Sequence, residues 1–512
     1  MAAKWLKDTV FYEIYPQSFY DTNGDGIGDF NGIIEKLDYI KGLGCNALWI
    51  NPCFDSPFKD AGYDVRDYKK VASRYGTNAD LYRLFGEAHR KGIRVFLDLV
   101  PGHTSEEHEW FRQSQKQEKN EYSNRYIWTD HWFKPAKGLN YVGGESERSG
   151  TYVLNFFKCQ PALNYGFLNP TESWQLPVDH PDVVATVEAL KDIMRFWLDH
   201  GCDGFRVDMA MSLVKNDDDK KTGTSAVWRN VREMLDKEYP DAAMVSEWSD
   251  PPVALRAGYD MDFYLNMPGN GYSTLMRDYE MHPDDDRSYF KKDGNGDISR
   301  FLDQYVKWYE DTKDIGYISM LTCNHDTTRP RYTLSPHELK IAYAFLFTMP
   351  GVPFLYYGDE IGMRYLDIPT KEGGYTRTGS RTPMQWNREK NLGFSTGCED
   401  ALYLPVDHAD DAPTVADQEN DPDSLLNTVK ELLALRHREA DLQADAPFTV
   451  LCADRGAPLV YKRGSLTVAL NPTEKEAAAD VPVKGEILYR IGKDAALGDR
   501  IVVPAQSFVI VR

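Results

Sequence analysis

The stretch Gly201-Cys-Asp-Gly-Phe-Arg-Val-Asp-Met-Ala210 is a short apolar run that ends in two charged residues, Arg206 and Asp208. Because alternate residues of a strand point to the same side, both side chains should project together from the strand's carboxyl end. Three other apolar runs also end in polar groups, and they lead to His103, Glu247 and Asp326. Such groups at the ends of several buried strands are typical of a β/α-barrel active site, whereas ordinary strand ends are the alternative.

The length and composition limit the class of protein and the kind of partner. A chain of 512 residues accommodates a barrel and one or two smaller domains. The net charge of −20, with no basic stripe, argues against nucleic-acid and anionic-membrane partners and fits a small neutral substrate. The N-terminus lacks an apolar signal-peptide core, and no run of 18 apolar residues occurs. We therefore expect a cytoplasmic protein without a membrane partner, either a monomer or a weak homodimer.

The seven cysteines are scattered and odd in number, and no two of them form a C-x-x-C pair. Several lie inside apolar runs, which indicates buried reduced thiols rather than a disulfide framework.

Strand-like and helical segments alternate along most of the chain, as expected for parallel strands joined by helices. The predicted strands are Val10–Tyr15, Ala47–Ile50, Ile93–Val100, Phe205–Asp208, Ala243–Glu247, Met261–Leu265, Tyr317–Cys323 and Val352–Tyr357. The predicted helices are Ile33–Gly42 (with Gly42 as its C-cap), Asn78–Lys91, Pro181–His200, Ala226–Tyr239, Phe301–Asp311, Pro336–Thr348 and Leu425–His437. This pattern predicts an α/β fold, a (β/α)8 TIM barrel.

Two regions depart from the alternation. Residues 104–178 are polar and rich in aromatic side chains, and this excursion is too long for a loop, so it predicts a small inserted domain after strand 3. Residues 444–512 consist of short alternating runs, which predict a C-terminal antiparallel β-sandwich. The two parts of the barrel then cover residues 1–103 and 179–443.

A loop rich in Gly and Asp follows the first strand, Asp21-Thr-Asn-Gly-Asp-Gly-Ile-Gly-Asp29. Its oxygens at alternate positions resemble a calcium loop, although the bidentate Glu that completes an EF-hand is missing. The candidate ligands are Asp21, Asn23, Asp25, the carbonyl of Ile27, and Asp29. We expect a structural Ca²⁺, with Mg²⁺ as the other candidate, and no organic cofactor. The alternative is a simple Gly/Asp turn.

The motifs together resemble the α-amylase family of glycoside hydrolases, and within it the oligo-1,6-glucosidase and α-glucosidase group. The motifs that carry the resemblance are Asp98-Leu-Val-Pro-Gly-His103, Gln160-Pro-Ala-Leu-Asn164, Gly204-Phe-Arg-Val-Asp208, Glu247 and Asn324-His-Asp326. The resemblance covers the chain from Val10 to its end. It implies the barrel, the inserted domain and the C-terminal sandwich described above.

The resemblance also implies roles for individual residues. Asp208 takes the position of the nucleophile and Glu247 that of the general acid/base, while Asp326 matches the third carboxylate, which stabilises the transition state. Tyr63 resembles the aromatic platform under the sugar. The other residues implied to bind substrate are Arg206, His103, His325, Arg381, and the pair Asp64 and Arg329, which would close the pocket around the non-reducing end.

The residue types suit this chemistry on physical grounds as well. Retaining glycoside hydrolysis needs one ionised carboxyl that attacks and one protonated carboxyl that donates. Arg206 next to Asp208 favours the ionised nucleophile, and the apolar run and Trp248 around Glu247 tend to raise the pKa of a donor. A third carboxylate stabilises a cationic transition state more than the ground state.

Several positions depart from the family pattern. Gly102 stands where the family usually has Asn, Ala162 replaces the usual Asp, and Ser246 and Trp248 around the acid are also uncommon. Met209 follows the nucleophile, where Val tends to accompany α-1,6 activity and Ala or Thr α-1,4 activity. These differences leave the linkage specificity open.

The sequence therefore predicts a retaining, exo-acting α-glucosidase that hydrolyses α-1,4 or α-1,6 bonds, or both, in short oligosaccharides. The alternatives are an α-glucosyl transferase or isomerase, such as a trehalose or isomaltulose synthase, and an endo-acting α-amylase. A non-catalytic relative is disfavoured because Asp208, Glu247 and Asp326 are all present.

Overall fold

The computed structural model describes residues 2–373 and 376–512, and its centre is a parallel sheet of eight strands. The strands are β1 (Phe11–Ile14), β2 (Ala47–Ile50), β5 (Arg94–Leu99), β8 (Gly204–Val207), β9 (Ala243–Ser246), β10 (Met261–Phe263), β11 (Tyr317–Ser319) and β12 (Phe354–Tyr356). Their order in the sheet follows the chain, and β1 pairs with both β2 and β12. A parallel bridge between Leu321 and Phe354 joins the last two strands, so the sheet closes into the predicted barrel.

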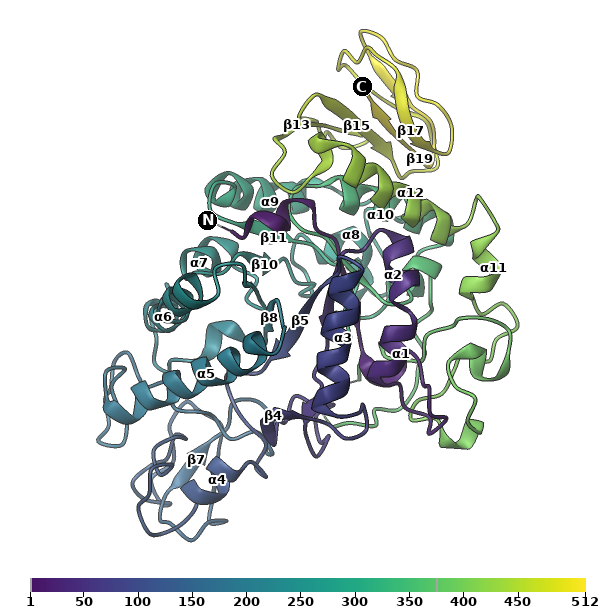
Figure 1. Ribbon diagram of the computed structural model, residues 1–512. Coiled ribbons are helices and arrows are strands. Elements are labelled where there is room, and N and C mark those ends of the chain that lie inside the picture. Colours follow the sequence, from purple (N-terminus) through teal and green to yellow (C-terminus); the bar gives the residue numbers. More distant parts are fainter. Residues whose placement is uncertain (1, 374–375) are drawn as a thin grey trace.

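Helices surround the sheet, as Figure 1 shows. They are α1 (Phe30–Glu35), α2 (Leu37–Leu43), α3 (Asn78–Arg90), α5 (Pro181–Asp199), α6 (Thr222–Glu238), α7 (Pro251–Arg256), α8 (Ser273–Met276), α9 (Ser299–Thr312), α10 (Pro336–Thr348), α11 (Val415–Glu419) and α12 (Leu425–Arg438). Local sequence sets several of their starts: capping boxes at Thr77 and Ser335 open α3 and α10, and Pro181 occupies the first turn of α5.

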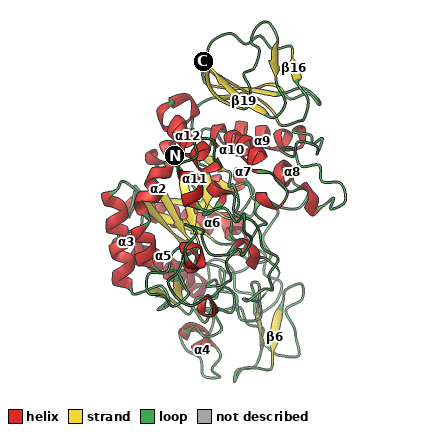
Figure 2. Cartoon of the chain, turned by 90° about the vertical axis from the view of Figure 1, so that its right-hand side faces the viewer, coloured by secondary structure: helices red, strands yellow, loops and turns green. Residues whose placement is uncertain are grey.

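The polar segment after β5 folds on one end of the barrel. It contains α4 (Glu109–Ser114) and the hairpin of β6 (Tyr141–Gly143) and β7 (Thr151–Val153). A second small hairpin, β3 (Phe54–Asp55) with β4 (Asp67–Val71), follows β2. Figures 1 and 2 place α4 and the β6–β7 hairpin at the opposite end of the molecule from the C-terminal strands.

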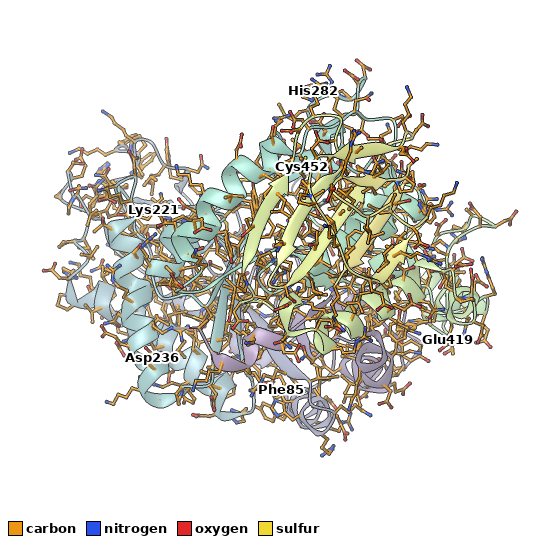
Figure 3. The ribbon with its side chains drawn as sticks, turned by 90° about the horizontal axis from the view of Figure 1, so that it is seen from above. Phe85, Lys221, Asp236, His282, Glu419 and Cys452 are labelled. Atoms are coloured by element: carbon orange, nitrogen blue, oxygen red, sulfur yellow. The ribbon has the colours of Figure 1, made fainter. Side chains whose placement is uncertain are left out.

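The C-terminal residues form two antiparallel sheets, as predicted. One consists of β13 (Phe448–Cys452), β14 (Leu459–Arg463), β15 (Leu466–Asn471), β19 (Ser507–Val511) and β17 (Ile487–Ile491), and the other of β16 (Ala477–Ala479) and β18 (Ile501–Val503). A small apolar core, which includes Val460, Val503 and Val509, packs between the two sheets. Figure 3 looks down on the larger sheet, with Cys452 on β13. The helix α10 is buried on nearly every face because it lies between this sheet and the barrel.

Several details differ from the sequence predictions. The segment predicted as one helix over Ile33–Gly42 is two short helices that meet at Lys36, and the C-cap is Gly44 rather than Gly42. Gly44 has a φ of 100°, the left-handed conformation that glycine adopts without strain. The strands β3, β4, β6, β13 and β16 were not predicted, and β11 ends at Ser319 rather than at Cys323. No helix in the described part of the chain is long and apolar enough to span a membrane.

Candidate active site

The carboxyl ends of the barrel strands surround a cavity of about 200 Å³. Its lining includes the three carboxylates that the sequence predicts to be catalytic, Asp208, Glu247 and Asp326. They follow β8, β9 and β11, strands far apart in the sequence that the closed barrel brings together. The geometry thus agrees with a site built from several strand ends.

Arg206 joins two of these carboxylates. It lies on β8 with only 1% of its surface exposed, and its guanidinium contacts Asp208 at 3.2 Å and Glu247 at 2.9 Å. Asp98, which is not one of the three predicted catalytic carboxylates, also lies 2.9 Å from the Arg206 guanidinium. The amide of Met209 also donates a hydrogen bond to Glu247 at 2.9 Å. Asp208 and Glu247 therefore lie on either side of one buried cation.

The three predicted carboxylates have different charge environments. Burial and the neighbouring Glu247 raise the pKa of Asp208, while Arg206 opposes this rise. Burial also favours protonation of Asp326, but His325, Arg377 and Arg381 outweigh it and lower the pKa of Asp326 well below its ordinary value. Asp326 is accordingly ionised, whereas Arg206 is the group that favours the ionised form of Asp208.

Tyr63 lines the floor of the site, and His325 lies directly behind it. Their rings stack at 5.4 Å between centroids, and the Tyr63 hydroxyl lies 2.5 Å from Nε2 of His325. Glu13 and Asp326 lie 2.9 and 3.3 Å from the two ring nitrogens of His325. Although burial lowers the pKa of His325, these two carboxylates raise it above its ordinary value.

His103 lies in the cavity wall in a fixed tautomer. The Asn155 amide lies 3.1 Å from Nδ1, and because an amide nitrogen only donates, Nδ1 accepts and Nε2 donates to the Tyr63 carbonyl. Burial lowers the pKa of His103 to about 4, so the ring is neutral at neutral pH. A Cβ on Gly102 would lie 2.8 Å from the Asn155 amide nitrogen. The Asn155 side chain therefore occupies the space that an asparagine side chain at position 102, usual in the family, would fill. Lys215, in turn, contacts the Asn155 carbonyl oxygen at 3.2 Å.

The predicted pocket-closing pair does not form. Asp64 accepts hydrogen bonds from Ser56 and from backbone amides of its own loop, and Arg329 is fully buried in an ion pair with Asp359. The pairing of Asp64 with Arg329 is therefore wrong. The reason is that Asp64 points into its own loop, where a buried carboxylate satisfies several amides.

Asp60 and Arg377 occupy the place expected for that pair. They form an ion pair in the cavity wall, and Arg377 also contacts Asp326 at 2.7 Å. Gln160, from the motif in the inserted region, donates to Asp60 at 2.6 Å. Burial raises the pKa of Asp60 to about 6, against the opposing effect of Arg377.

Three of the residues predicted to bind substrate lie behind the cavity wall rather than in it. Arg206, His325 and Arg381 are at most 1% exposed. Arg381 contacts Asp326 at 2.8 Å and Glu372 at 3.1 Å, and it donates to the His325 carbonyl. These residues position the groups that line the cavity, while Tyr63 and His103 line it directly.

One wall of the cavity is apolar. It consists of Phe156, Met209, Met211, Leu265 and Met267. Phe156 and Met267 are about two-fifths exposed, at 43% each, which places them at the cavity mouth. Such a wall suits the apolar face of a sugar ring or of its leaving group.

Sequence reasoning missed Asp60, Arg377, Asn155 and Lys215. A signal existed for Asp60, which lies in the same loop as Tyr63, three residues earlier. For Asn155 the signal was Gly102, since a missing side chain in a close-packed site must be replaced by another group. Nothing in the sequence distinguishes Arg377 from Arg329 as the partner of an aspartate.

The predicted calcium loop lies apart from the residues that line the cavity. Asp21 accepts bonds from the amides of Gly24 and Gly26, and Asp29 caps α1 at the Gly32 amide. The donor set is all oxygen, which suits Ca²⁺ or Mg²⁺. No cluster of three His, Cys, Asp or Glu side chains with metal-binding geometry occurs among the described residues, so a site here depends also on Asn23 and a backbone carbonyl.

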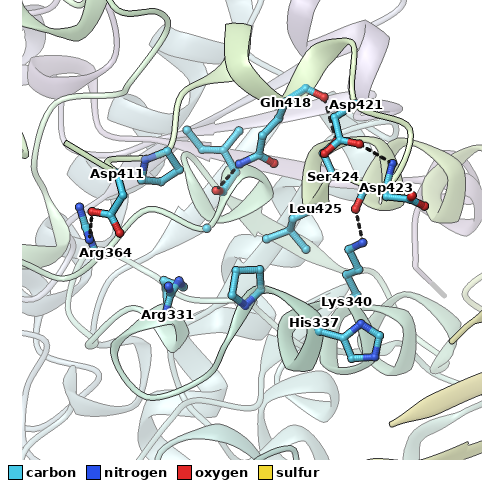
Figure 4. Close-up of a pocket in the computed structure, with 14 residues that line it drawn as sticks. Arg331, His337, Lys340, Arg364, Asp411, Gln418, Asp421, Asp423, Ser424 and Leu425 are labelled. Atoms are coloured by element: carbon cyan, nitrogen blue, oxygen red, sulfur yellow. Dashed lines mark hydrogen bonds and ion pairs between the residues drawn. The ribbon is translucent and has the colours of Figure 1, made fainter. Parts of the chain in front are cut away.

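A larger cavity of about 410 Å³ lies beside the starts of α10 and α12 (Figure 4). Its charged groups are already engaged: Arg364 pairs with Asp411, and Lys340 donates to the Asp423 carbonyl. None of the described residues lining it is Phe, Tyr or Trp, and it contains no catalytic carboxylate. It therefore lacks the features expected of a sugar-cleaving site.

Comparison with known proteins agrees with this geometry. The profile of the α-amylase catalytic domain matches residues 13–445. The chain therefore belongs to the α-amylase family, and it is a glycoside hydrolase or transferase of that family. This confirms the family resemblance and the fold inferred above.

Relatives with different activities are similar to the chain. An oligo-1,6-glucosidase of Heyndrickxia coagulans is 32% identical, with 94% of each chain covered. A trehalose synthase/amylase of Mycolicibacterium smegmatis is 33% identical over 90% of this chain and 80% of that protein. The crystal structure of a mutant isomaltulose synthase of Erwinia rhapontici, in complex with sucrose, superposes with a TM-score of 0.82 at 26% identity, covering 99% of both chains.

Proposed function

We propose that the protein is a retaining, exo-acting α-glucosidase that hydrolyses α-1,4 or α-1,6 bonds, or both, of short oligosaccharides. One observation carries the proposal: Asp208 and Glu247 flank Arg206 in a cavity that Asp60 and Arg377 close. The family and the oligo-1,6-glucosidase relative support it. Product chromatography on maltose, isomaltose, sucrose and trehalose tests it, and release of glucose from maltose or isomaltose is the expected result.

In the first step, Asp208 attacks the anomeric carbon as the glycosidic bond breaks. The electrons of that bond pass to the leaving oxygen, which takes the proton of Glu247. This step requires an ionised Asp208 and a proton on Glu247; Arg206 contacts Asp208 at 3.2 Å and opposes the rise in its pKa. The products are a glucosyl ester of Asp208 and a free sugar.

In the second step, Glu247 takes a proton from a water molecule, and the oxygen of that water attacks the same carbon and displaces Asp208. Both transition states carry positive charge on the sugar ring, and the ionised Asp326 stabilises this charge. Two displacements restore the original α configuration. Tyr63 supplies the aromatic surface under the ring.

The exo mode rests on the pair of Asp60 and Arg377. Their side chains close the cavity wall next to Asp326 and offer charged groups to the hydroxyls of a terminal glucose. With this pair in the cavity wall, we expect no path for a polysaccharide chain beyond it, so glucose should be released singly from non-reducing ends. Starch is expected to be a poor substrate, which argues against the endo-acting amylase.

The variant Arg377→Ala should lose about 2–5 kcal/mol of transition-state binding, because it leaves Asp60 buried and unpaired. The measurement is kcat/KM on maltose or isomaltose. Arg329→Ala is the matched control, since Arg329 is an equally buried arginine paired with Asp359 away from the cavity. The control should lower the melting temperature yet keep kcat/KM, and equal losses of kcat/KM in both variants would contradict the pocket role of Arg377.

A transferase or isomerase is the second candidate. The relatives named trehalose synthase and isomaltulose synthase favour it, and so does the apolar wall, which suits a sugar acceptor more than water. Both candidates share the glucosyl ester and differ only in the acceptor of the second step. Conversion of sucrose or maltose into an isomeric disaccharide, with little free glucose, would establish the transferase.

We propose further that the loop Asp21–Asp29 binds one Ca²⁺, or Mg²⁺, through Asp21, Asn23, Asp25, Ile27 and Asp29. Chelation should lower the melting temperature by a few degrees and leave kcat unchanged at temperatures where the protein stays folded, because only the folded state binds the ion. Asp25→Ala should abolish the chelator effect. Metal analysis of the purified protein that finds no divalent cation, together with no thermal shift, would overturn the site.

The expected setting is the cytoplasm. All seven cysteines are free thiols in the structure, four of them buried, which suits a reducing compartment. The partner that we propose is a short oligosaccharide, bound by a monomer or a weak homodimer.

A further inference from the structure

A buried carboxylate that the mechanism above does not use lies next to the strand of Glu247. Asp262 is at the centre of β10, pairs with Ser246 of β9, and has no exposed surface. No ion pair reaches it among the described residues. A carboxylate buried without a cation is costly, so its hydrogen-bond partners indicate why it is there.

The partners of Asp262 lie on both sides of Glu247. Its Oδ1 accepts from the Ser246 hydroxyl at 2.6 Å and from the Ser249 amide at 3.3 Å. Its Oδ2 accepts from the Asp250 amide at 2.9 Å. One side chain therefore binds the residue before Glu247 and the turn that follows it.

The turn after Glu247 needs such support. Ser249 has a φ of 62°, a left-handed conformation that is strained for a residue with a side chain. Its hydroxyl accepts from the Leu265 amide at 3.2 Å, so a second bond from the segment after β10 also holds the turn. Strained backbone persists only where surrounding contacts fix it, and Asp262 supplies several of these contacts.

The arrangement tolerates either protonation state of Asp262. Burial raises the pKa of this carboxyl to about 8, while the bonds from Ser246 and the two amides lower it. In the protonated form the carboxyl donates to Ser246, whose hydroxyl then turns to the Met261 carbonyl, 3.4 Å away. The heavy atoms keep their places in both forms, and the turn stays fixed.

We propose that Asp262 is a positioning residue for the acid/base Glu247, holding the Ser246–Asp250 turn so that the carboxyl faces the glycosidic oxygen. Arg206 and the Met209 amide fix the carboxylate end of Glu247, and Asp262 fixes its backbone. Since proton transfer requires close alignment, a shift of about 1 Å costs on the order of 100-fold in rate. This inference rests on the role proposed above for Glu247.

The test compares two substrates that differ in their need for a proton. Isomaltose, or maltose if it is the better substrate, requires protonation of its leaving group, whereas α-glucosyl fluoride does not. Asp262→Ala should lower the glycosylation rate on the disaccharide roughly 10- to 100-fold with little change in KM. The glycosylation rate on the fluoride, measured in a single turnover, should change little.

Two further variants make the test specific. Asp262→Asn should restore most of the disaccharide rate, because its amide donates to Ser246 and its carbonyl accepts from the Asp250 amide. Asp260→Asn is the matched control: this buried carboxylate precedes the same strand, but it binds Arg232 and the Met244 amide, away from Glu247. The control should lose stability without changing the ratio of the two rates.

Equal losses on both substrates in Asp262→Ala would overturn the proposal and leave Asp262 a purely structural residue. If Asp262→Ala does not fold, Ser246→Ala provides the test, because it removes only the hydrogen bond between the Ser246 hydroxyl and Asp262. This variant should shift the ratio of the two rates in the same direction. An unchanged ratio overturns the proposal. Failure of the proposed function is distinguishable, since the unmodified protein would then cleave neither substrate.

Discussion

Asp208→Asn should lower turnover by about 10⁴- to 10⁶-fold, the loss typical of a covalent nucleophile. An amide cannot form the glucosyl ester, although it keeps the shape of the side chain and a contact to Arg206. The measurement pairs kcat on maltose and isomaltose with trapping by a fluorinated glucosyl fluoride. In the unmodified protein, peptide mapping should place the trapped sugar on Asp208.

The control for this variant is Asp203→Asn. Asp203 lies just before the same strand, β8, at its amino end, where it pairs with Arg94 and accepts from the Val95 amide. The same chemical change there should reduce stability and leave the trapped adduct intact. Activity of Asp208→Asn near that of the unmodified protein, or an adduct on another residue, would show that the nucleophile has been misassigned.

Glu247→Gln should lower kcat on natural disaccharides by about 10²- to 10⁴-fold, the contribution expected of a general acid/base. The glutamine retains hydrogen bonding but has no proton to give to a leaving sugar. Glycosylation by α-glucosyl fluoride, which needs no proton, should stay fast and give a burst of fluoride. The second step should then be slow, because no base remains to activate water.

Azide provides an independent check on the Glu247 variant. It attacks the glucosyl ester without losing a proton, so it should accelerate the second step and yield an α-glucosyl azide. The Asp208 variant should show no such acceleration. Equal impairment of Glu247→Gln on the disaccharide and on the fluoride would contradict the acid/base role.

The barrel was predictable because strand-like and helical segments alternate along most of the sequence. Seven of the eight short apolar runs, such as Ala47–Ile50, became strands within a residue or two of their expected ends, whereas the run Tyr317–Cys323 gave a strand that ends at Ser319. The carboxylates at the strand ends then had to meet, since parallel strands place their carboxyl ends on one face. The meeting of Asp208, Glu247 and Asp326 followed from this topology, whereas their individual roles were implied by the family resemblance.

Contacts between loops were not predictable in the same way. The direction in which Asp64 points depends on the amides of its own loop, and the choice between Arg329 and Arg377 depends on how two long segments cross. A sequence shows residue types but not these crossings. The strand β16 was missed because three alanines carry no alternation of polar and apolar residues.

Two of the five positions that depart from the family pattern have an explanation in the three-dimensional structure. Gly102 makes room for the Asn155 amide, and Ser246 donates to Asp262. In each case the unusual residue interacts with the side chain of a residue elsewhere in the sequence. Each of these two unusual positions is therefore coupled to a second residue in the structure.

The central claim, a double displacement at the anomeric carbon with release of single glucose units, is tested most directly by the configuration of the first product. Proton NMR during the first minutes of hydrolysis of the methyl glycoside of maltose or isomaltose, in which the anomeric carbon of the leaving sugar is blocked, separates α-glucose from β-glucose before the two interconvert. The proposed mechanism predicts that α-glucose appears first, released from the non-reducing end. β-Glucose as the first product would mean a single displacement and would contradict the glucosyl ester on Asp208.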